Sequence, residues 1–182
     1  MVGEDNKARF DALVVPHLAE ALALARWLAG NRTDAEDIVQ EACLRAFRAI
    51  DGFSGGSARA WVLTIVRRTA YSWLSKNRVP AVVAVDDLNL RERTWAEHGG
   101  DGDASNNATP ETQLIAKSDA ARLEAAIVAL PVEFRETFVL RDIQGLGYRE
   151  IAEVTGTPLG TVMSRLARAR RRLIDDVGTA QR

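Results

Sequence analysis

Residues 148–173 read YREIAEVTGTPLGTVMSRLARARRRL and decide the fold of the C-terminal part of the chain. The pattern predicts a short helix over residues 148–155, followed by a tight turn at Gly156. Thr157 can cap a second helix, and Pro158 suits the first helical position. Two helices joined by so short a turn are typical of a helix-turn-helix, whose second helix enters the major groove of DNA.

The second predicted helix has two distinct faces. Val162, Leu166, Ala169 and Leu173 step by four, three and four residues, which predicts a buried stripe. Another face carries the side chains that could reach base edges or phosphates: Thr161, Ser164, Arg165, Arg168 and Arg172. Residues 157–173 hold five arginines and no acid, which suits phosphate contacts. The alternative is a helical hairpin whose arginines only solvate its surface.

Apolar spacing predicts three helices in the N-terminal half, over residues 10–29, 33–50 and 58–77. Thr33 and Glu36 fit a capping box at the start of the second helix. A glycine-containing loop separates the second helix from the third. Since no alternating strand pattern of useful length occurs, we expect an all-α fold.

A second helical domain is expected from about Glu111, with a helix that begins near Pro131 and carries Phe134 and Phe138. The segment that precedes this domain is rich in acids, glycine, serine and asparagine, which favours a flexible acidic linker. The sequence therefore predicts two small helical domains, with the boundaries 1–78, 79–111 and 112–182.

Composition excludes several classes of protein. The chain has 182 residues, of which 47% are hydrophobic and 27% charged, as in ordinary soluble proteins. Its longest strictly apolar run, Ala125–Leu130, is far too short for a membrane span, so we expect a cytoplasmic protein without membrane insertion. Cys43 is the only cysteine, which excludes an intrachain disulfide and a multi-cysteine zinc site.

Catalytic and cofactor motifs are missing from the sequence. There is no phosphate-binding Walker loop and no nucleophile elbow, and the two histidines, His17 and His98, lack the spacing of metal ligands. A Cys43 nucleophile is formally possible, but the residue lies in the middle of a predicted helix, where apolar packing is expected. We expect no enzyme, no cofactor and no metal.

The helix over residues 58–77 mixes aromatic and basic side chains. Aromatic rings can stack on unpaired bases, and nearby cations can hold a strand. The residues concerned are Trp61, Arg67, Arg68, Tyr71, Trp73 and Lys76. The alternative is that the tryptophans belong to the hydrophobic core.

Acidic side chains gather at the start of the helix over residues 33–50. Asp34, Asp37 and Glu41 share one helix face. Acids near a helix N-terminus are favourable in themselves, which is the alternative to a binding role. A carboxylate metal site is a second option, but no histidine has suitable spacing.

Together these motifs resemble the extracytoplasmic-function (ECF) group of sigma factors in the sigma-70 family. Residues 34–47, DAEDIVQEACLRAF, look like region 2.2 of that family, and residues 61–74 look like regions 2.3 and 2.4. Residues 129–131, 138–141, 148–152 and 160–170 look like region 4. The resemblance covers roughly residues 10–78 and 112–174.

The resemblance implies a promoter-specificity factor that binds the RNA polymerase core and directs initiation at minus-35 and minus-10 promoter elements, often in stress responses. It implies a core-binding set of Glu36, Asp37, Gln40 and Glu41. It implies minus-10 contacts through Phe53, Ser54, Arg67, Arg68, Tyr71, Trp73 and Lys76. It implies minus-35 contacts through Thr161, Ser164, Arg165, Arg168 and Arg172.

The resemblance also implies control by an anti-sigma factor. The chain departs from many relatives, which have Asn in place of Arg68 and Asp in place of Ser72, and this concerns the detail of minus-10 specificity. Rival readings are a sigma mimic that binds only an anti-sigma factor, a free-standing helix-turn-helix repressor, and an enzyme.

Overall fold

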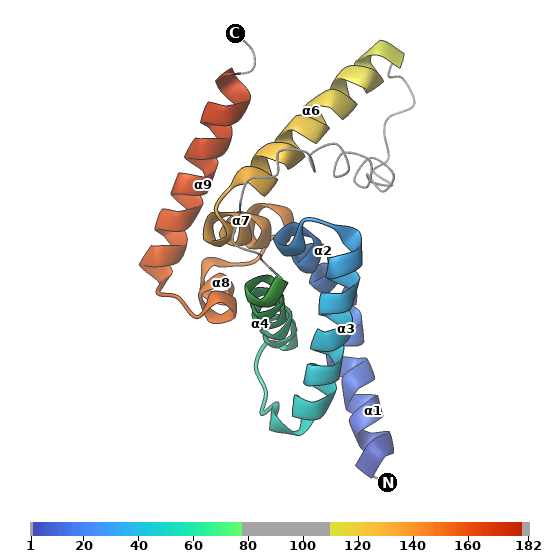
Figure 1. Cartoon of the computed structure of the whole chain (residues 1–182). Helices are drawn as coiled ribbons and strands as arrows, with labels where there is room; N and C mark the ends of the chain where they lie inside the picture. The colour runs from blue at the N-terminus through green and yellow to red at the C-terminus, as the bar shows by residue number, and fades with distance from the viewer. Residues whose placement is uncertain (1, 78–109, 180–182) are drawn as a thin grey trace.

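The computed structural model describes residues 2–77 and 110–179, and in these ranges the secondary structure is entirely helical (Figure 1). The N-terminal unit, residues 2–77, contains α1 (Val2–Leu13), η1 (Val15–His17), α2 (Leu18–Ala29), α3 (Arg32–Ala49), η2 (Ile50–Gly52) and α4 (Ala58–Asn77). The C-terminal unit, residues 110–179, contains α6 (Pro110–Ala129), α7 (Val132–Phe138), the π-helical segment η4 (Val139–Ile143), α8 (Tyr148–Thr155) and α9 (Leu159–Thr179). The predicted all-α fold is confirmed, whereas the predicted acidic linker lies almost wholly outside the described residues.

The prediction of one continuous helix over residues 10–29 was wrong. The structure divides this stretch at η1, which contains Pro16, into the separate helices α1 and α2. Proline has no backbone N–H and its ring clashes with the preceding turn, so a regular helix cannot pass through it unbroken. The predicted stop at the end of α2 is confirmed, because Gly30 has φ +83°, which favours glycine.

The predicted capping box of Thr33 and Glu36 was also wrong. Helix α3 begins at Arg32, and its N-cap is Asn31, whose Oδ1 accepts a hydrogen bond of 2.9 Å from the Asp34 backbone N–H. The Glu36 carboxylate instead accepts from Arg32 Nε at 2.6 Å. Asparagine caps helices as well as serine or threonine does, so the N-cap of α3 lies two residues earlier than predicted without loss.

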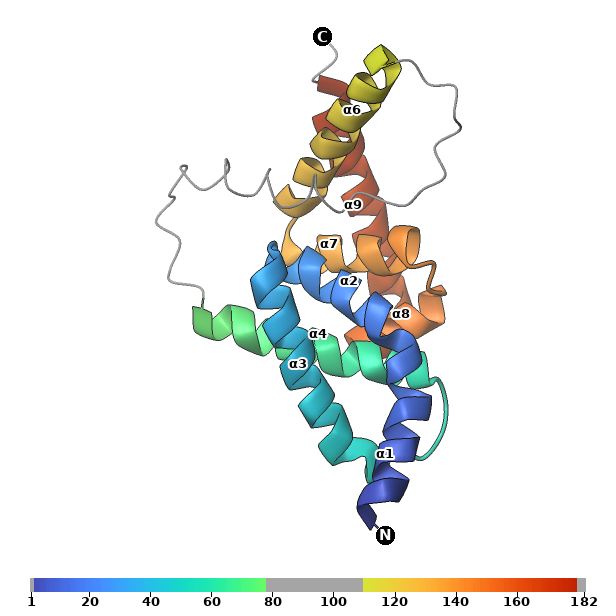
Figure 2. The same ribbon diagram turned by 90° about the vertical axis from the view of Figure 1, so that its right-hand side faces the viewer.

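The core of the N-terminal unit lies between α2, α3 and α4, which pack against one another (Figures 1 and 2). Its largest fully buried side chains include Leu24, Leu28, Ile38, Leu63 and Val66. Full burial of such a side chain contributes about 1.5–3 kcal/mol. The stretch Asp5–Ala29 is long and apolar enough by composition alone to cross a membrane, and 33% of its apolar window is buried in the protein.

The helix-turn-helix is present as the sequence predicts. Helix α8 covers residues 148–155, and Gly156 adopts the left-handed conformation with φ +64°. The stripe of Val162, Leu166, Ala169 and Leu173 is buried. Helix α9 begins at Leu159 rather than at Pro158, and the Thr157 hydroxyl lies 2.8 Å from that of Thr155.

The two units pack against each other, which the sequence did not predict. Helix α4 lies against α8, and α2 lies against α7 (Figure 2). Buried Arg135 of α7 donates to the Trp27 carbonyl of α2 at 3.0 Å, and also to the carbonyls of Val128 in α6 and of Leu130 just after it. One guanidinium group therefore ties three helices together.

Candidate functional site

The predicted DNA-reading face lies along α9. Ser164, Arg168 and Arg172 are exposed, while Thr161 and Arg165 are half-buried. The Arg172 guanidinium lies over the Phe134 ring, 5.2 Å from its centroid, which orients one cation of this face. The structure thus places all five predicted side chains on one helix, with the buried stripe of α9 holding that face outward.

One arginine of α9 forms an ion pair with an acid of the same chain. Arg170 makes two hydrogen bonds to the Asp142 carboxylate, of 3.1 and 2.6 Å. The Asp142 carboxylate, as the first cause, raises the pKa of Arg170 further above its already high value. Arg170 was not among the predicted contacts, and its pairing leaves Arg168 and Arg172 as the two predicted contact arginines that are exposed.

The predicted minus-10 set on α4 is divided by the packing of the two units. Arg68 and Lys76 are exposed, and Trp73 is half-buried against the core. Arg67 and Tyr71, in contrast, point at the C-terminal unit. This division follows from helix geometry. Arg67 and Tyr71 are four residues apart and share one face of α4, whereas Arg68, the next residue after Arg67, lies on a different face.

The Glu136 carboxylate of α7 accepts hydrogen bonds from the side chains of Arg67 and Tyr71. Its Oε1 accepts from Arg67 Nε, and its Oε2 accepts from the Tyr71 hydroxyl at 3.1 Å. Burial outweighs the attraction of Arg67 and raises the pKa of Glu136 above the ordinary carboxyl value. Burial and then the negative charge of Glu136 raise the pKa of Tyr71, which is therefore a neutral phenol at physiological pH.

The loop before α4 carries the other two residues predicted for minus-10 contacts. The ring centroids of Phe53 and Trp61 are 5.2 Å apart at a tilted angle, and Ser54 is exposed. Gly55 and Gly56 have φ values of +114° and +95°, a backbone that other residues rarely adopt. The loop is therefore shaped by its glycines and backed by an aromatic pair.

The predicted core-binding face lies on α3. Glu36, Asp37 and Gln40 are exposed, and Glu41 is half-buried. Arg45 Nε donates to Glu41 Oε1 at 2.8 Å, and this hydrogen bond is the first cause that lowers the pKa of Glu41. The Glu41 carboxylate therefore stays ionised well below neutral pH.

Two apolar side chains lie exposed further along α3, and the sequence reasoning missed them. Leu44 is 49% exposed and Phe47 41% exposed. The signal was available, because both fall off the buried stripe of Ala35, Ile38, Ala42 and Ala46. An acidic face with apolar neighbours is typical of a protein-docking surface.

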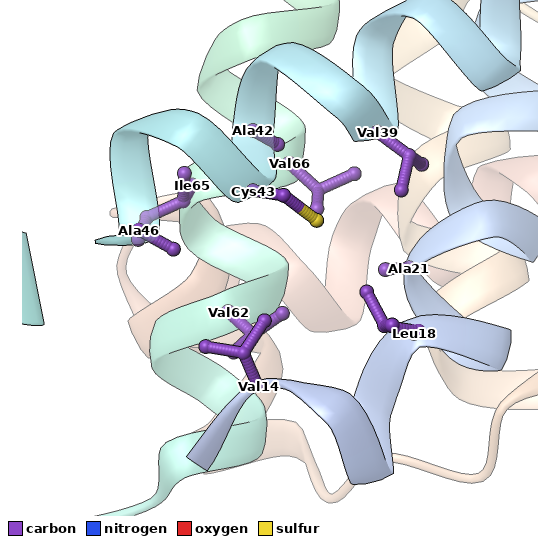
Figure 3. A pocket seen from close by; sticks show the side chains of 10 residues that line it. All are labelled: Val14, Leu18, Ala21, Val39, Ala42, Cys43, Ala46, Val62, Ile65 and Val66. Atoms are coloured by element: carbon purple, nitrogen blue, oxygen red, sulfur yellow. The ribbon is translucent and has the colours of Figure 1, made fainter. Parts of the chain in front are cut away.

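Cys43 has the packing role expected of it. It lies among apolar residues of α2, α3 and α4 beside a cavity of about 10 Å³ (Figure 3). Burial raises the pKa of its thiol, which disfavours the reactive thiolate. Among the residues that the structure describes, no group of acidic, histidine or cysteine side chains could hold a metal ion.

Comparison with known families gives two matches on this chain. Residues 13–79 match the model described as Sigma-70 region 2, and residues 120–173 match that described as Sigma-70, region 4. The two matched segments correspond to the N-terminal and C-terminal units, so each surface described above lies inside a matched segment.

Relatives align over most of the chain. The ECF RNA polymerase sigma-E factor of Escherichia coli is 35% identical over 169 residues, which cover 91% of this chain and 84% of that protein. The RNA polymerase sigma-H factor of Pseudomonas aeruginosa is 32% identical, over 93% of this chain and 86% of that one. The ECF sigma factor SigE of Mycolicibacterium smegmatis is 34% identical, and the chain spans 60% of its length.

Solved structures show the same fold. The sigma factor RpoE of Bartonella quintana, in complex with the anti-sigma factor NepR, superposes with a TM-score of 0.66 and 25% identity, over 93% of this chain and 96% of that one. CnrH, in complex with the cytosolic domain of CnrY, gives a TM-score of 0.64 over 93% of this chain and 88% of that one, at 24% identity.

Proposed function

Because the chain belongs to the extracytoplasmic-function sigma factors of the sigma-70 family, we propose that it binds the RNA polymerase core and selects promoters through minus-35 and minus-10 elements. It performs no covalent chemistry of its own and acts in the cytoplasm. The observation that carries this proposal is the exposed basic face of α9 on an intact helix-turn-helix, within a chain that also matches region 2.

The C-terminal unit reads the minus-35 element through α9. Arginine can pair with guanine through two hydrogen bonds, and hydroxyl groups reach base edges or phosphates. Arg168 and Arg172 are exposed for this purpose, and Ser164 lies between them and Thr161 on the same surface. The basic face rules against the sigma mimic, which would not need to retain DNA contacts.

The N-terminal unit supplies the minus-10 contacts. The loop with Phe53 and Ser54 captures a flipped base, and the basic and aromatic side chains of α4 hold the opened strand. Unstacking of a base costs a few kcal/mol, which its capture offsets. The side chains of α4 that hold the opened strand are Arg67, Arg68, Tyr71, Trp73 and Lys76.

The acidic face of α3 docks on the polymerase core. The charge of this face suits a basic partner surface and would steer the approach of that partner. The residues concerned are Glu36, Asp37, Gln40 and Glu41. The exposed side chains of Leu44 and Phe47 extend the same surface and supply apolar area that a stable interface buries.

An anti-sigma factor controls the chain by covering its functional surfaces. The Bartonella quintana relative is bound to such a factor in its solved structure. Retrieval of the chain from its native cells without any such partner would argue against this control.

Transcription in vitro with purified core polymerase tests the proposal. Addition of the chain should produce transcripts from specific genomic promoters. The double variant Asp37→Lys, Glu41→Lys should lose core binding and transcription while its circular dichroism spectrum is unchanged, because the reversed charges repel a basic partner. Asp119→Lys, an exposed position on α6, is the matched control and should retain activity. No promoter-specific transcript from any template would contradict the proposal and favour the repressor or enzyme readings.

A further inference from the structure

The two proposed nucleic-acid surfaces differ in whether the chain itself covers them. The Glu136 side chain is fully buried, and that of Arg67 is 19% exposed. Both groups come from surfaces that would be open to solvent if the units separated. Their burial therefore results from the packing of the N-terminal unit on the C-terminal unit.

The Glu136 carboxylate imitates a phosphate group on α4. Its two oxygens accept from Arg67 and from the Tyr71 hydroxyl, as phosphate oxygens would. The Arg67 guanidinium also lies over the Tyr71 ring, 4.6 Å from its centroid, so one face of that ring is covered. A single strand cannot use this cation and this ring while α7 remains in place.

A second group of contacts closes the same interface at another point. The residue that follows the π-helical segment η4 is Gln144, whose Nε2 donates to the Glu20 carbonyl of α2 at 2.8 Å. Arg59 of α4 donates to the Gln144 carbonyl at 2.7 Å and to Glu20 Oε2 at 2.6 Å. Because a π-helical turn is rare and often occurs at functional sites, its position at this contact is informative.

We propose that the free chain is autoinhibited, with Glu136 occupying the place of the minus-10 strand on Arg67 and Tyr71 until the two units separate. This inference rests on the proposed function, since it takes those two residues as strand contacts. The contact at Gln144 stabilises the closed arrangement without touching the strand-binding side chains. Polymerase binding, which sets the distance between the units, then exposes the α4 surface at the point where it is needed.

A closed arrangement weakens the apparent affinity of the chain for a single strand by a predictable factor. When only a fraction of the molecules is open, the apparent dissociation constant for a single strand equals the intrinsic constant divided by that fraction. A substitution that destabilises only the closed arrangement therefore tightens strand binding, although it adds no contact to DNA.

The variant Glu136→Ala tests the proposal. It leaves Arg67 and the Tyr71 hydroxyl without their acceptor in the closed arrangement, whereas alanine suits α7 when the units are apart. We expect binding of a fluorescein-labelled, mixed-sequence single-stranded oligodeoxynucleotide, measured by anisotropy, to tighten about tenfold. Small-angle X-ray scattering of the same sample should show a larger radius of gyration. The matched control is Glu153→Ala, which removes an exposed carboxylate of α8 and should change binding far less.

The variant Gln144→Ala keeps the test decisive if Glu136→Ala fails to fold. It removes the hydrogen bond to the Glu20 carbonyl, and it should tighten strand binding in the same direction but by a smaller factor. Unchanged binding and an unchanged radius of gyration in the folded variants would overturn the proposal. An equal gain from Glu153→Ala would also overturn it, because loss of negative charge alone would then explain the effect.

Failure of this proposal can be distinguished from failure of the proposed function. If the unaltered chain supports promoter-specific transcription and the variants bind as it does, the function stands and the autoinhibition falls. If no transcription occurs but Glu136→Ala expands the chain, the closed contact stands and its assignment to the minus-10 strand falls.

Discussion

The basic surfaces of α4 and α9 have similar compositions and different surroundings. On α9, Arg168 and Arg172 face solvent, and Asp142 pairs with Arg170. On α4, the carboxylate of Glu136 takes up both Arg67 and Tyr71. The surface on α9 is open to a nucleic acid, whereas the part of the α4 surface around Arg67 and Tyr71 is already filled by a carboxylate, a group with chemistry similar to that of phosphate.

This difference teaches that a charge pattern indicates what a surface can bind but not when it can bind. Both helices were predicted to contact nucleic acid for the same reason, because each carries a run of basic side chains without acids. The acid that closes α4 lies 65 residues from Tyr71 in the chain, so no local pattern reveals it. The accessibility of a predicted site is a tertiary property.

The largest expected effect comes from Leu63→Ala in α4. Leu63 is fully buried, and its truncation should cost about 2–5 kcal/mol of unfolding free energy. Because α4 also packs against α8, we expect one cooperative denaturation curve for both units, shifted as a whole when followed by circular dichroism. Ser75→Ala, exposed on the same helix, should shift it little. Two separate transitions, of which only one moves, would contradict the joint packing of the units.

Arg165→Ala sharpens the comparison from the side of α9. If Arg165 reads a base, its loss should weaken binding of the holoenzyme to promoter DNA with the minus-35 element by about 1–3 kcal/mol. Fluorescence anisotropy across sequence variants of the element measures the change, with Arg122→Ala on α6 as the control. An equal loss on every sequence would identify a phosphate contact instead, and no loss would remove Arg165 from the reading face.

Glu136 gives the closed surface a dependence on pH that the arginines of α9 lack. The groups that face it are Arg67 and Tyr71 of α4 and, at longer range, the charge of Arg165. The pKa of Glu136 is raised in the folded chain, so its protonation stabilises the folded state. This contribution to the free energy of unfolding is fully present below the ordinary carboxyl pKa and is lost as the pH rises through the raised value. Denaturation of the unaltered chain and of Glu136→Ala at several pH values should therefore show a difference in stability that falls with increasing pH. A difference that grows with pH would contradict this sign.

The smallest effect is expected from Asp142→Asn. The side chains of Arg170 and Asp142 are 48% and 27% exposed, and such surface ion pairs contribute about 0–1 kcal/mol. A double-mutant cycle with Arg170→Gln, measured by chemical denaturation, isolates the pair. A coupling energy well above this range would mean that the pair organises the C-terminal unit and does more than neutralise one arginine.

Much of the local structure could be predicted from the sequence. The stripe from Val162 to Leu173 and the left-handed Gly156 follow from helix periodicity and from the conformational freedom of glycine, so the helix-turn-helix was predicted almost to the residue. The acidic face of α3 follows from the same periodicity. Leu44 and Phe47 could have been added by noting which apolar residues fall off the buried stripe.

The exact helix boundaries and the contact between the two units could not be predicted, because the sequence allows several alternatives and does not rank them. Asn31 and Thr33 are both acceptable N-caps, and in the structure Asn31 takes this position. Pro16 could end a helix or kink it, and here it divides α1 from α2. The contact of Glu136 with Arg67 joins units that are separate in sequence, so only the folded chain reveals it.

The most direct test of this account is the distance between the two units before and after assembly of the transcription complex. Spin labels at Arg48→Cys on α3 and Arg149→Cys on α8, both exposed positions, can be introduced into a Cys43→Ala background. Pulsed electron paramagnetic resonance should give one narrow, short distance distribution for the free chain and a clearly longer one with core polymerase and promoter DNA. The same distribution in both states would contradict the account.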